Sequence, residues 1–306
     1  MPKLTTYTTP LNADQVGVLR ELLVGQQFEF ETKPYTIFTA KKGKLNIAVY
    51  EKGPKAVLQG KDLEDFITFT LEPFVLGEAK LGYDEVYEPE KFEPHFGIDE
   101  SGKGDFFGPL VIAGAYVDAD IARTLKEAGI QDSKNIGSDK RIRDLAAVIR
   151  RTRTPQTVIM IGPEKYNQLF AKFKNLNRLL AWGHARAIEN LCELRPDCPR
   201  ALSDKFADES LIKRALIDKG KLLKLEQRTK AESDYAVAAA SILAREKFID
   251  WLQKTGDDLG LTLPRGASAQ VKATARTLVQ GKGAEILGTI AKTHFKTASE
   301  VLGDAP

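Results

Sequence analysis

The sequence has 306 residues, of which 42% are hydrophobic and 28% are charged, and its formal net charge is +3. This balance is typical of a globular protein and excludes wholesale disorder, while the length allows two domains. The net charge is too small to indicate a nucleic-acid partner by itself, and no apolar run reaches the roughly 18 residues of a membrane-spanning helix.

Residues 1–77 predict a small α+β domain. Apolar residues recur at helical spacing over residues 13–25, with Asn12 in the N-cap position and Gly25 at the end. Three stretches with β character follow at residues 35–40, 44–50 and 55–59, and the glycine-bearing turns between them are the signature of a β-meander. Residues 61–71 are again helical in pattern. Residues 78–94, rich in Glu, Gly, Pro and Tyr, form the expected linker.

Basic residues are concentrated on the predicted meander. Residues 41–61 contain six lysines and one acid, Glu51. Because side chains alternate along a strand, Lys44, Asn46, Ala48 and Tyr50 share one polar face, and the apolar residues between them share the other. Two interpretations remain: a solvated face whose lysines protect edge strands, or a surface that contacts phosphates. We favour the second, with Lys42, Lys44, Tyr50 and Lys52 as the candidate contacts.

Residues 95–306 predict an α/β domain. Strand patterns at 95–98, 110–117, 158–161 and 201–203 alternate with helical patterns at 121–128, 138–150, 165–194 (with a break) and 233–251. Such interleaving favours a sheet covered by helices.

The two cysteines, Cys192 and Cys198, do not have the spacing or the companions of a structural zinc site. Isolated thiols suit a reducing compartment, and the first residues contain no apolar signal segment. We therefore expect a soluble, cytoplasmic protein that does not associate with membranes.

Two adjacent acids, Asp99 and Glu100, directly follow the apolar residues 96–98. Neighbouring carboxylates repel each other unless water or a cation compensates their charge. A pair of divalent ions does so, and it can activate a water and stabilise the leaving oxygen of a phosphodiester. Taken alone, however, the pair favours a polar turn that closes a strand.

The next residues, Ser101-Gly102-Lys103-Gly104, change that balance. Glycines on both sides of a lysine let the backbone approach a ligand closely, and exposed backbone groups can recognise a ribose 2′-hydroxyl. Residues 97–103 also fit part of a P-loop, but Gly104 stands where that motif needs Ser or Thr. A nucleotide-hydrolysing P-loop is therefore excluded. Phe106 and Phe107 are expected to pack the loop onto the core.

Two further acids follow later in the chain. Asp204 comes after a short apolar run, and Asp234 precedes the alanine-rich residues 236–244, near a helix N-terminus where Thr229 and Glu232 have capping-box spacing. Judged alone, both are ordinary turn or helix-start residues. His95 and His184 are interpreted as structural or surface residues, since metal-driven hydrolysis needs no histidine base.

The thirteen residues from Asp99 to Val111 resemble the signature of the type 2 ribonucleases H, and specifically bacterial ribonuclease HIII. Ribonuclease HII usually carries arginine where this chain has Lys103, and it lacks a long N-terminal extension. Asp132-Ser133-Lys134 is similar to another segment of the family. The resemblance extends over essentially the whole chain.

This resemblance implies a ribonuclease H-like catalytic domain, a mixed sheet with flanking helices, preceded by a small α+β domain similar to the TATA-box-binding protein. It implies that Asp99, Glu100, Asp204 and Asp234 are the acidic active-site residues and hold Mg²⁺ or Mn²⁺. Ser101, Gly102, Lys103, Gly104, Ser133 and Lys134 would contact an RNA–DNA hybrid, the expected partner of a monomeric enzyme. The implied reaction is hydrolysis of the RNA strand to 5′-phosphate and 3′-hydroxyl ends. A non-catalytic nucleic-acid-binding protein of the same fold is the alternative.

Overall fold

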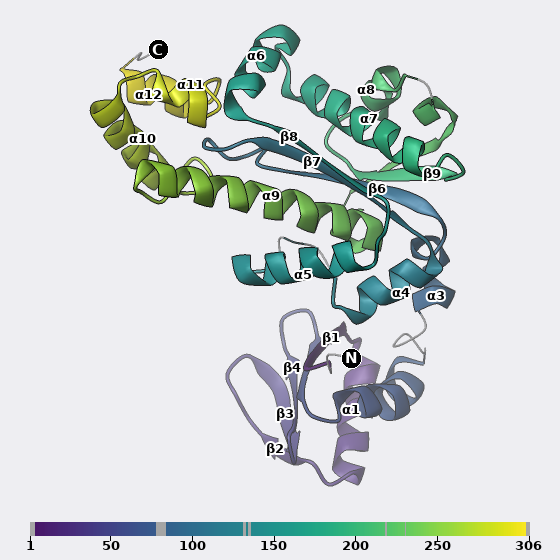
Figure 1. Ribbon diagram of the computed structural model, residues 1–306. Coiled ribbons are helices and arrows are strands. Elements are labelled where there is room, and N and C mark those ends of the chain that lie inside the picture. Colours follow the sequence, from purple (N-terminus) through teal and green to yellow (C-terminus); the bar gives the residue numbers. More distant parts are fainter. Residues whose placement is uncertain are drawn as a thin grey trace. The chain divides into compact units, whose positions relative to one another are not determined.

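The computed structural model describes residues 4–77, 84–130, 133, 136–217, 219–229 and 231–303. The chain divides into two compact units, Met1–Glu90 and Lys91–Pro306, which are described separately (Figure 1).

The first unit is built on an antiparallel sheet with the strand order β1-β5-β4-β3-β2. Its strands are β1 (Thr6–Pro10), β2 (Glu29–Glu31), β3 (Thr36–Lys42), β4 (Leu45–Tyr50) and β5 (Lys55–Gly60). The last three confirm the predicted meander. Along β4, Leu45, Ile47 and Val49 are buried, whereas Asn46 is exposed, as the alternation predicts. One face of the sheet is thus apolar and the other polar.

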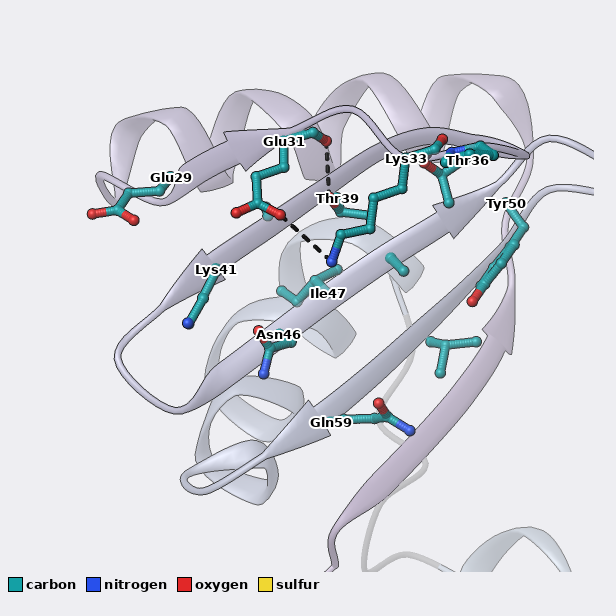
Figure 2. Close-up of a pocket in the computed structure, with 14 residues that line it drawn as sticks. Glu29, Glu31, Lys33, Thr36, Thr39, Lys41, Asn46, Ile47, Tyr50 and Gln59 are labelled. Carbon is teal, nitrogen blue, oxygen red and sulfur yellow. Dashed lines mark hydrogen bonds and ion pairs between the residues drawn. The ribbon is translucent and has the colours of Figure 1, made fainter.

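Helices cover the apolar face of this sheet, behind the strands in Figure 2. Helix α1 (Ala13–Gly25) has the predicted bounds, and Asn12 caps it by accepting a hydrogen bond from the backbone N–H of Gln15. Helix α2 (Leu63–Phe66) continues into the π-helix η1 (Ile67–Leu76), so the second predicted helix is longer than expected. Leu19, Leu23, Ile47 and Leu58 belong to the shared core.

The predicted linker, residues 78–94, lies partly outside the described residues. Its described part contains two short helices, α3 (Asp84–Tyr87) and η2 (Pro89–Lys91), where no regular structure was expected.

The second unit contains a mixed sheet with the strand order β10-β9-β6-β7-β8. Its strands are β6 (His95–Ser101), β7 (Leu110–Val117), β8 (Gln156–Ile161), β9 (Arg200–Asp204) and β10 (Lys224–Arg228). β6 pairs antiparallel with β7 and parallel with β9. The predicted α/β class is confirmed; β10 was missed.

Helices flank both faces of this sheet (Figure 1). The core on one face joins residues of α5 (Asp139–Arg151) and α9 (Tyr235–Leu259) to the sheet, and the core on the other joins α6 (Pro163–Phe173), α7 (Leu176–Leu194) and α8 (Glu209–Ala215). α6 and α7 confirm the predicted break. The remaining helices are α4 (Ala119–Glu127), α10 (Ala269–Lys282), α11 (Ile286–Ile290) and α12 (Lys296–Leu302), and the 3₁₀ turns are η4 (Lys219–Leu222) and η5 (Ala231–Ser233).

Both cysteines are buried free thiols, as expected. Burial raises the pKa of Cys198 to about 11. None of the described helices is long and apolar enough to cross a membrane.

Candidate active site

Three of the predicted acids meet at one end of the sheet of the second unit. β6 does not stop before the acids but runs to Ser101, so Asp99 and Glu100 lie within the strand. Asp204 ends β9, and the parallel register Ile98↔Ser203 puts it beside Asp99, at the roughly 4.8 Å spacing of neighbouring strands. Asp99, Glu100 and Asp204 line a common pocket of about 400 Å³.

Glu100 is held by two basic side chains. His184 of α7 contacts its Oε2 through Nε2 at 3.0 Å, and Lys103 Nζ lies 3.3 Å from Oε1. Burial by itself raises the pKa of this carboxyl, but the hydrogen bond and charge of His184, together with those of Lys103, outweigh it and lower the pKa. The group is therefore an anion that is already oriented.

His184 links two of the candidate acids. It is fully buried, so of the two expected roles, structural and surface, the surface role is ruled out, and its Nδ1 lies 3.0 Å from Ser203 Oγ. The Ser203 hydroxyl donates to the backbone carbonyl of Asp204 at 3.1 Å. One ring thus ties the Glu100 carboxylate to the end of β9, which carries Asp204.

Asp234 occupies a different place. It is the N-cap of α9 and accepts hydrogen bonds from the backbone N–H groups of Ala236 and Val237. Nε2 of the buried His95 contacts both of its carboxylate oxygens, at 2.9 and 3.0 Å. His95 begins β6, four residues before Asp99, which is about 13 Å along a strand. Asp234 is not among the residues that line the pocket.

The turn before Asp234 lies closer to the other acids. The backbone N–H of Ala231, in η5, donates to Asp204 Oδ1 at 3.3 Å. Glu232 is the next residue in that turn and is partly buried. The capping-box prediction for Thr229 and Glu232 is wrong, because α9 begins only after Asp234. Glu232 therefore does not cap α9, and it belongs to a turn whose backbone contacts Asp204.

The glycine-bearing loop forms one wall of the pocket, which Ser101, Gly102, Lys103 and Gly104 all line. Gly102 has φ +85°, and a Cβ there would lie 2.9 Å from the Phe248 ring, so its glycine is required by the fold. Gly104 has open space around it. Since neither backbone conformation nor packing requires glycine at 104, an approaching ligand is a physical reason for it.

Sequence reasoning missed residues of α9 and of the segment after it that complete the pocket. Ser241, Arg245 and Arg265 line it, and Ser241 Oγ lies 2.7 Å from the buried Ser133 Oγ. Arg245 donates to the Ser133 carbonyl. Ser241 and Arg245 are four residues apart, so helical periodicity could have placed them on one face. The predicted contact Lys134 lies outside the described residues.

The candidate residues of the first unit do not share one surface. Tyr50 lines a hollow of about 520 Å³ on the open sheet face, together with Lys41, Asn46 and Gln59 (Figure 2). Lys42 instead donates to the backbone carbonyl of Gln26 at 2.7 Å and lies over the Phe28 ring. Lys44 and Lys52 are exposed in turns. The open face also carries Glu29 and Glu31, so its charge is mixed.

The donor set of the pocket suits hard divalent cations, because it consists of carboxylate oxygens at strand ends. As the side chains stand, no three His, Cys, Asp or Glu residues in the described part of the chain are close enough together to enclose an ion. Glu100 is engaged by His184 and Lys103 instead, so a cation would compete with Lys103 for this carboxylate.

Comparisons with known proteins agree on the family to which the chain is similar. The family model described as ribonuclease HII matches residues 96–298. Ribonuclease HIII of Protochlamydia amoebophila (strain UWE25) is 42% identical over 303 residues, which is 99% of this chain and 99% of that protein. The ribonuclease HIII of Chlamydia abortus (strain DSM 27085 / S26/3) is 43% identical and covers 97% of each chain.

Solved structures resemble the chain as well. The crystal structure of Bst ribonuclease HIII in complex with Mn²⁺ matches with a TM-score of 0.67 and 27% identity, over 98% of this chain and 99% of that one. A ribonuclease HII from Archaeoglobus fulgidus, solved in complex with PCNA, matches with a TM-score of 0.54 and 27% identity, over 65% of this chain and 93% of that one.

Proposed function

The chain belongs to the ribonuclease HIII family, and from that premise we propose which of its residues perform the reaction. It is a ribonuclease H, an endonuclease that hydrolyses the RNA strand of RNA–DNA hybrids. The observation that carries the assignment is the meeting of Asp99, Glu100 and Asp204 in one pocket, with the Gly102–Gly104 loop as its wall.

Asp99, Glu100 and Asp204 would hold the metal ions, for which Mg²⁺ and Mn²⁺ both suit the oxygen donors. Bound ions would supply an activated water and charge stabilisation for the leaving oxygen. His184 of α7 orients the Glu100 carboxylate through its contact with Oε2. Lys103 pairs with Glu100 before substrate binds, and it lies at the pocket wall where it can neutralise a phosphate.

For the fourth acid we favour Glu232 over Asp234. The helix cap and His95 already engage the Asp234 carboxylate, and Asp234 is not among the residues that line the pocket. Glu232 instead belongs to the turn whose backbone contacts Asp204. Asp234 remains the candidate that its place before the alanine-rich helix suggested, so variants at both positions are needed.

The loop Ser101–Gly104 would recognise the RNA strand. Its glycines expose backbone groups at the pocket wall, and such groups can contact the 2′-hydroxyl that distinguishes RNA from DNA. Ser133 also lines the pocket, where it is hydrogen-bonded to Ser241, and it would contact the same strand together with Lys134.

The first unit would bind the hybrid outside the active site, as the resemblance to the TATA-box-binding protein suggests. Its open face offers Lys41, Asn46, Tyr50 and Gln59, which can contact phosphates and sugars. Lys44 and Lys52 at the turns add positive charge beside it. We also propose that the protein acts as a monomer in the cytoplasm.

The decisive experiment is cleavage of a labelled RNA–DNA hybrid by the full chain, with DNA duplex as the control, in Mg²⁺ and in Mn²⁺. We expect cutting of the hybrid alone, leaving 3′-hydroxyl ends, and no cutting by the Asp99→Asn variant, which should still bind hybrid. If Asp99→Asn cuts at the normal rate, the assignment of the acids is wrong. A duplex with one ribonucleotide tests how much RNA the site requires.

A further inference from the structure

Lys292 is a buried amine that none of the proposed chemistry uses. Among the lysines that the structure describes, it alone is buried, with an exposed fraction of 0%. Taking an amine out of water is costly unless polar groups replace the water, so a fully buried lysine requires a physical reason. Its partners supply that reason.

Both partners of the amine belong to the loop that follows the Gly-Lys-Gly segment. Lys292 Nζ donates to the backbone carbonyl of Asp105 at 2.9 Å and to that of Gly108 at 2.7 Å. Gly108 has φ +90°, so the chain turns sharply there. The two contacts join the ends of a four-residue turn through a single nitrogen atom.

Backbone groups around Lys292 also form hydrogen bonds with the same turn. Lys292 N–H donates to the Phe106 carbonyl, and Gly108 N–H donates to the Ile290 carbonyl, each at 2.9 Å. On the other side of the turn, the Gly266 N–H donates to Asp105 Oδ1 at 2.6 Å. Asp105 comes directly after Gly104, so the position of the recognition loop depends on segments more than 150 residues later in the chain.

The segment that carries Lys292 is itself anchored. Asn167 of α6 donates to the carbonyls of Gly288 and Ala291 and accepts from the Thr293 N–H at 3.0 Å. The Tyr166 ring lies 5.5 Å from the lysine nitrogen, and His294 lies 5.6 Å from the same ring. The segment that carries the amine is therefore hydrogen-bonded to α6 on both sides of Lys292.

Asp105 and His294 are two titratable neighbours of the amine. Burial lowers the pKa of Lys292 to about 7, against the opposing charge of Asp105. Burial, with the charge of Lys292, also lowers the pKa of His294. Two backbone acceptors suit either state of the amine, since a neutral amine keeps two N–H donors.

We propose that Lys292 is a positioning residue for RNA recognition: by tying the carbonyls of Asp105 and Gly108 together, it fixes the Gly102–Gly104 backbone in the shape that binds the RNA strand. It acts through the loop and does not contact the substrate. The inference rests on the proposed role of that loop, and it makes the C-terminal segment part of substrate recognition.

The test compares two variants of nearly equal size, Lys292→Gln and Lys292→Met. Both side chains are one atom shorter than lysine, but only glutamine keeps N–H donors. We expect the Met variant to raise KM for the hybrid about tenfold with a smaller change in kcat, and the Gln variant to lie between it and the parent. Lys296→Met, at a position that is 79% exposed, is the control and should leave both constants unchanged.

The outcomes separate positioning from mere stability. If lysine only stabilises the fold, both variants lower the active fraction and hence the apparent kcat, with KM unchanged, and the proposal is overturned. Equal KM values for the Gln and Met variants also overturn it, because the donor would then be irrelevant.

A second readout does not depend on activity. Amide hydrogen exchange in the unliganded protein should accelerate over residues 101–108 in the Met variant, while α5 keeps its protection. Unchanged exchange in the loop refutes the role of Lys292 even if hybrid cleavage occurs. Accelerated exchange in a chain that cuts no hybrid would instead refute the proposed function.

Discussion

Gly97 is the position where a single methyl group should disturb the active site most directly. It lies in β6, two residues before Asp99, and a Cβ there would fall far inside van der Waals contact with the backbone of Ala236 and Val237 in α9. Backbone atoms of a helix cannot rotate away as the end of a side chain can. The Gly97→Ala variant must therefore push the start of α9 away from the sheet by on the order of 1 Å to restore normal contact.

Gly97→Ala is expected to lower both the free energy of unfolding and kcat. Overpacking of a core typically costs 1–3 kcal/mol, and a backbone obstacle places Gly97→Ala at the upper end, about 3 kcal/mol. For a unit of this size that lowers Tm by roughly 6–12 °C. The turn with Ala231 and Glu232 precedes α9 and moves with it, and a displacement of about 1 Å near reacting groups can lower kcat about 100-fold.

The measurement pairs thermal unfolding with hybrid cleavage at a temperature where the variant is still folded. Gly281→Ala in α10 is the control, since a Cβ there meets no atom within 4 Å. It should be as stable as the parent or more stable by up to about 1 kcal/mol, because alanine favours helices. A Gly97→Ala protein with parental stability and kcat would show that α9 does not pack on β6 as described.

Four further outcomes are expected. Glu232→Gln should lower kcat about 100-fold and Asp234→Asn less than about 10-fold, because asparagine keeps the helix cap; the reverse order would assign the fourth position to Asp234. Gly104→Ala should change the free energy of unfolding by less than about 1 kcal/mol and yet raise KM for the hybrid, since its Cβ occupies only ligand space; an unchanged KM would remove Gly104 from the recognition loop. Lys41→Gln should reduce the slope of log affinity against log salt by roughly 1 and Lys42→Gln should not, because Lys42 is bound to Gln26; equal effects would discard the open face of the sheet as the binding surface. The pKa of Lys292 is about 7 in the folded protein and about 10.5 in the unfolded chain, so between these values the unfolded state binds more protons. The free energy of unfolding of the parent, relative to that of Lys292→Met, should therefore rise with pH in that window by up to about 1.4 kcal/mol per pH unit. A difference that stays constant between about pH 6.5 and 9 would contradict the burial of the amine.

Sequence patterns predicted those elements that are marked by capping residues or by a regular spacing of apolar residues. The capping residue and apolar spacing of α1 gave its bounds, and the alternation along β4 gave its buried face. β1 and β2 were missed because one ends in proline and the other has three residues, too few to show a period. β6 was ended too early, since adjacent acids were interpreted as a turn, whereas the pairing with β7 continues through Ser101.

The buried histidines show what a single sequence cannot supply. His95 contacts an acid 139 residues away, and His184 contacts one 84 residues away. Nothing near either histidine in the chain reveals an acidic partner, and a lone histidine in an apolar helix has the same local pattern whether or not it touches an active site. Only the pairing of strands and the docking of α7 and α9 on the sheet bring these groups together.

The choice of the fourth acid illustrates the same limit at closer range. Glu232 and Asp234 are two residues apart, and both precede the alanine-rich helix, so sequence context favoured the one nearer to it. The distinction depends on where the helix begins. Because Asp234 is the N-cap, its carboxylate turns back to the N–H groups of Ala236 and Val237, where His95 also binds it. A carboxylate with these three donors gives up well-made hydrogen bonds when it moves to a metal, whereas Glu232 does not cap α9 and lies in the turn whose backbone contacts Asp204.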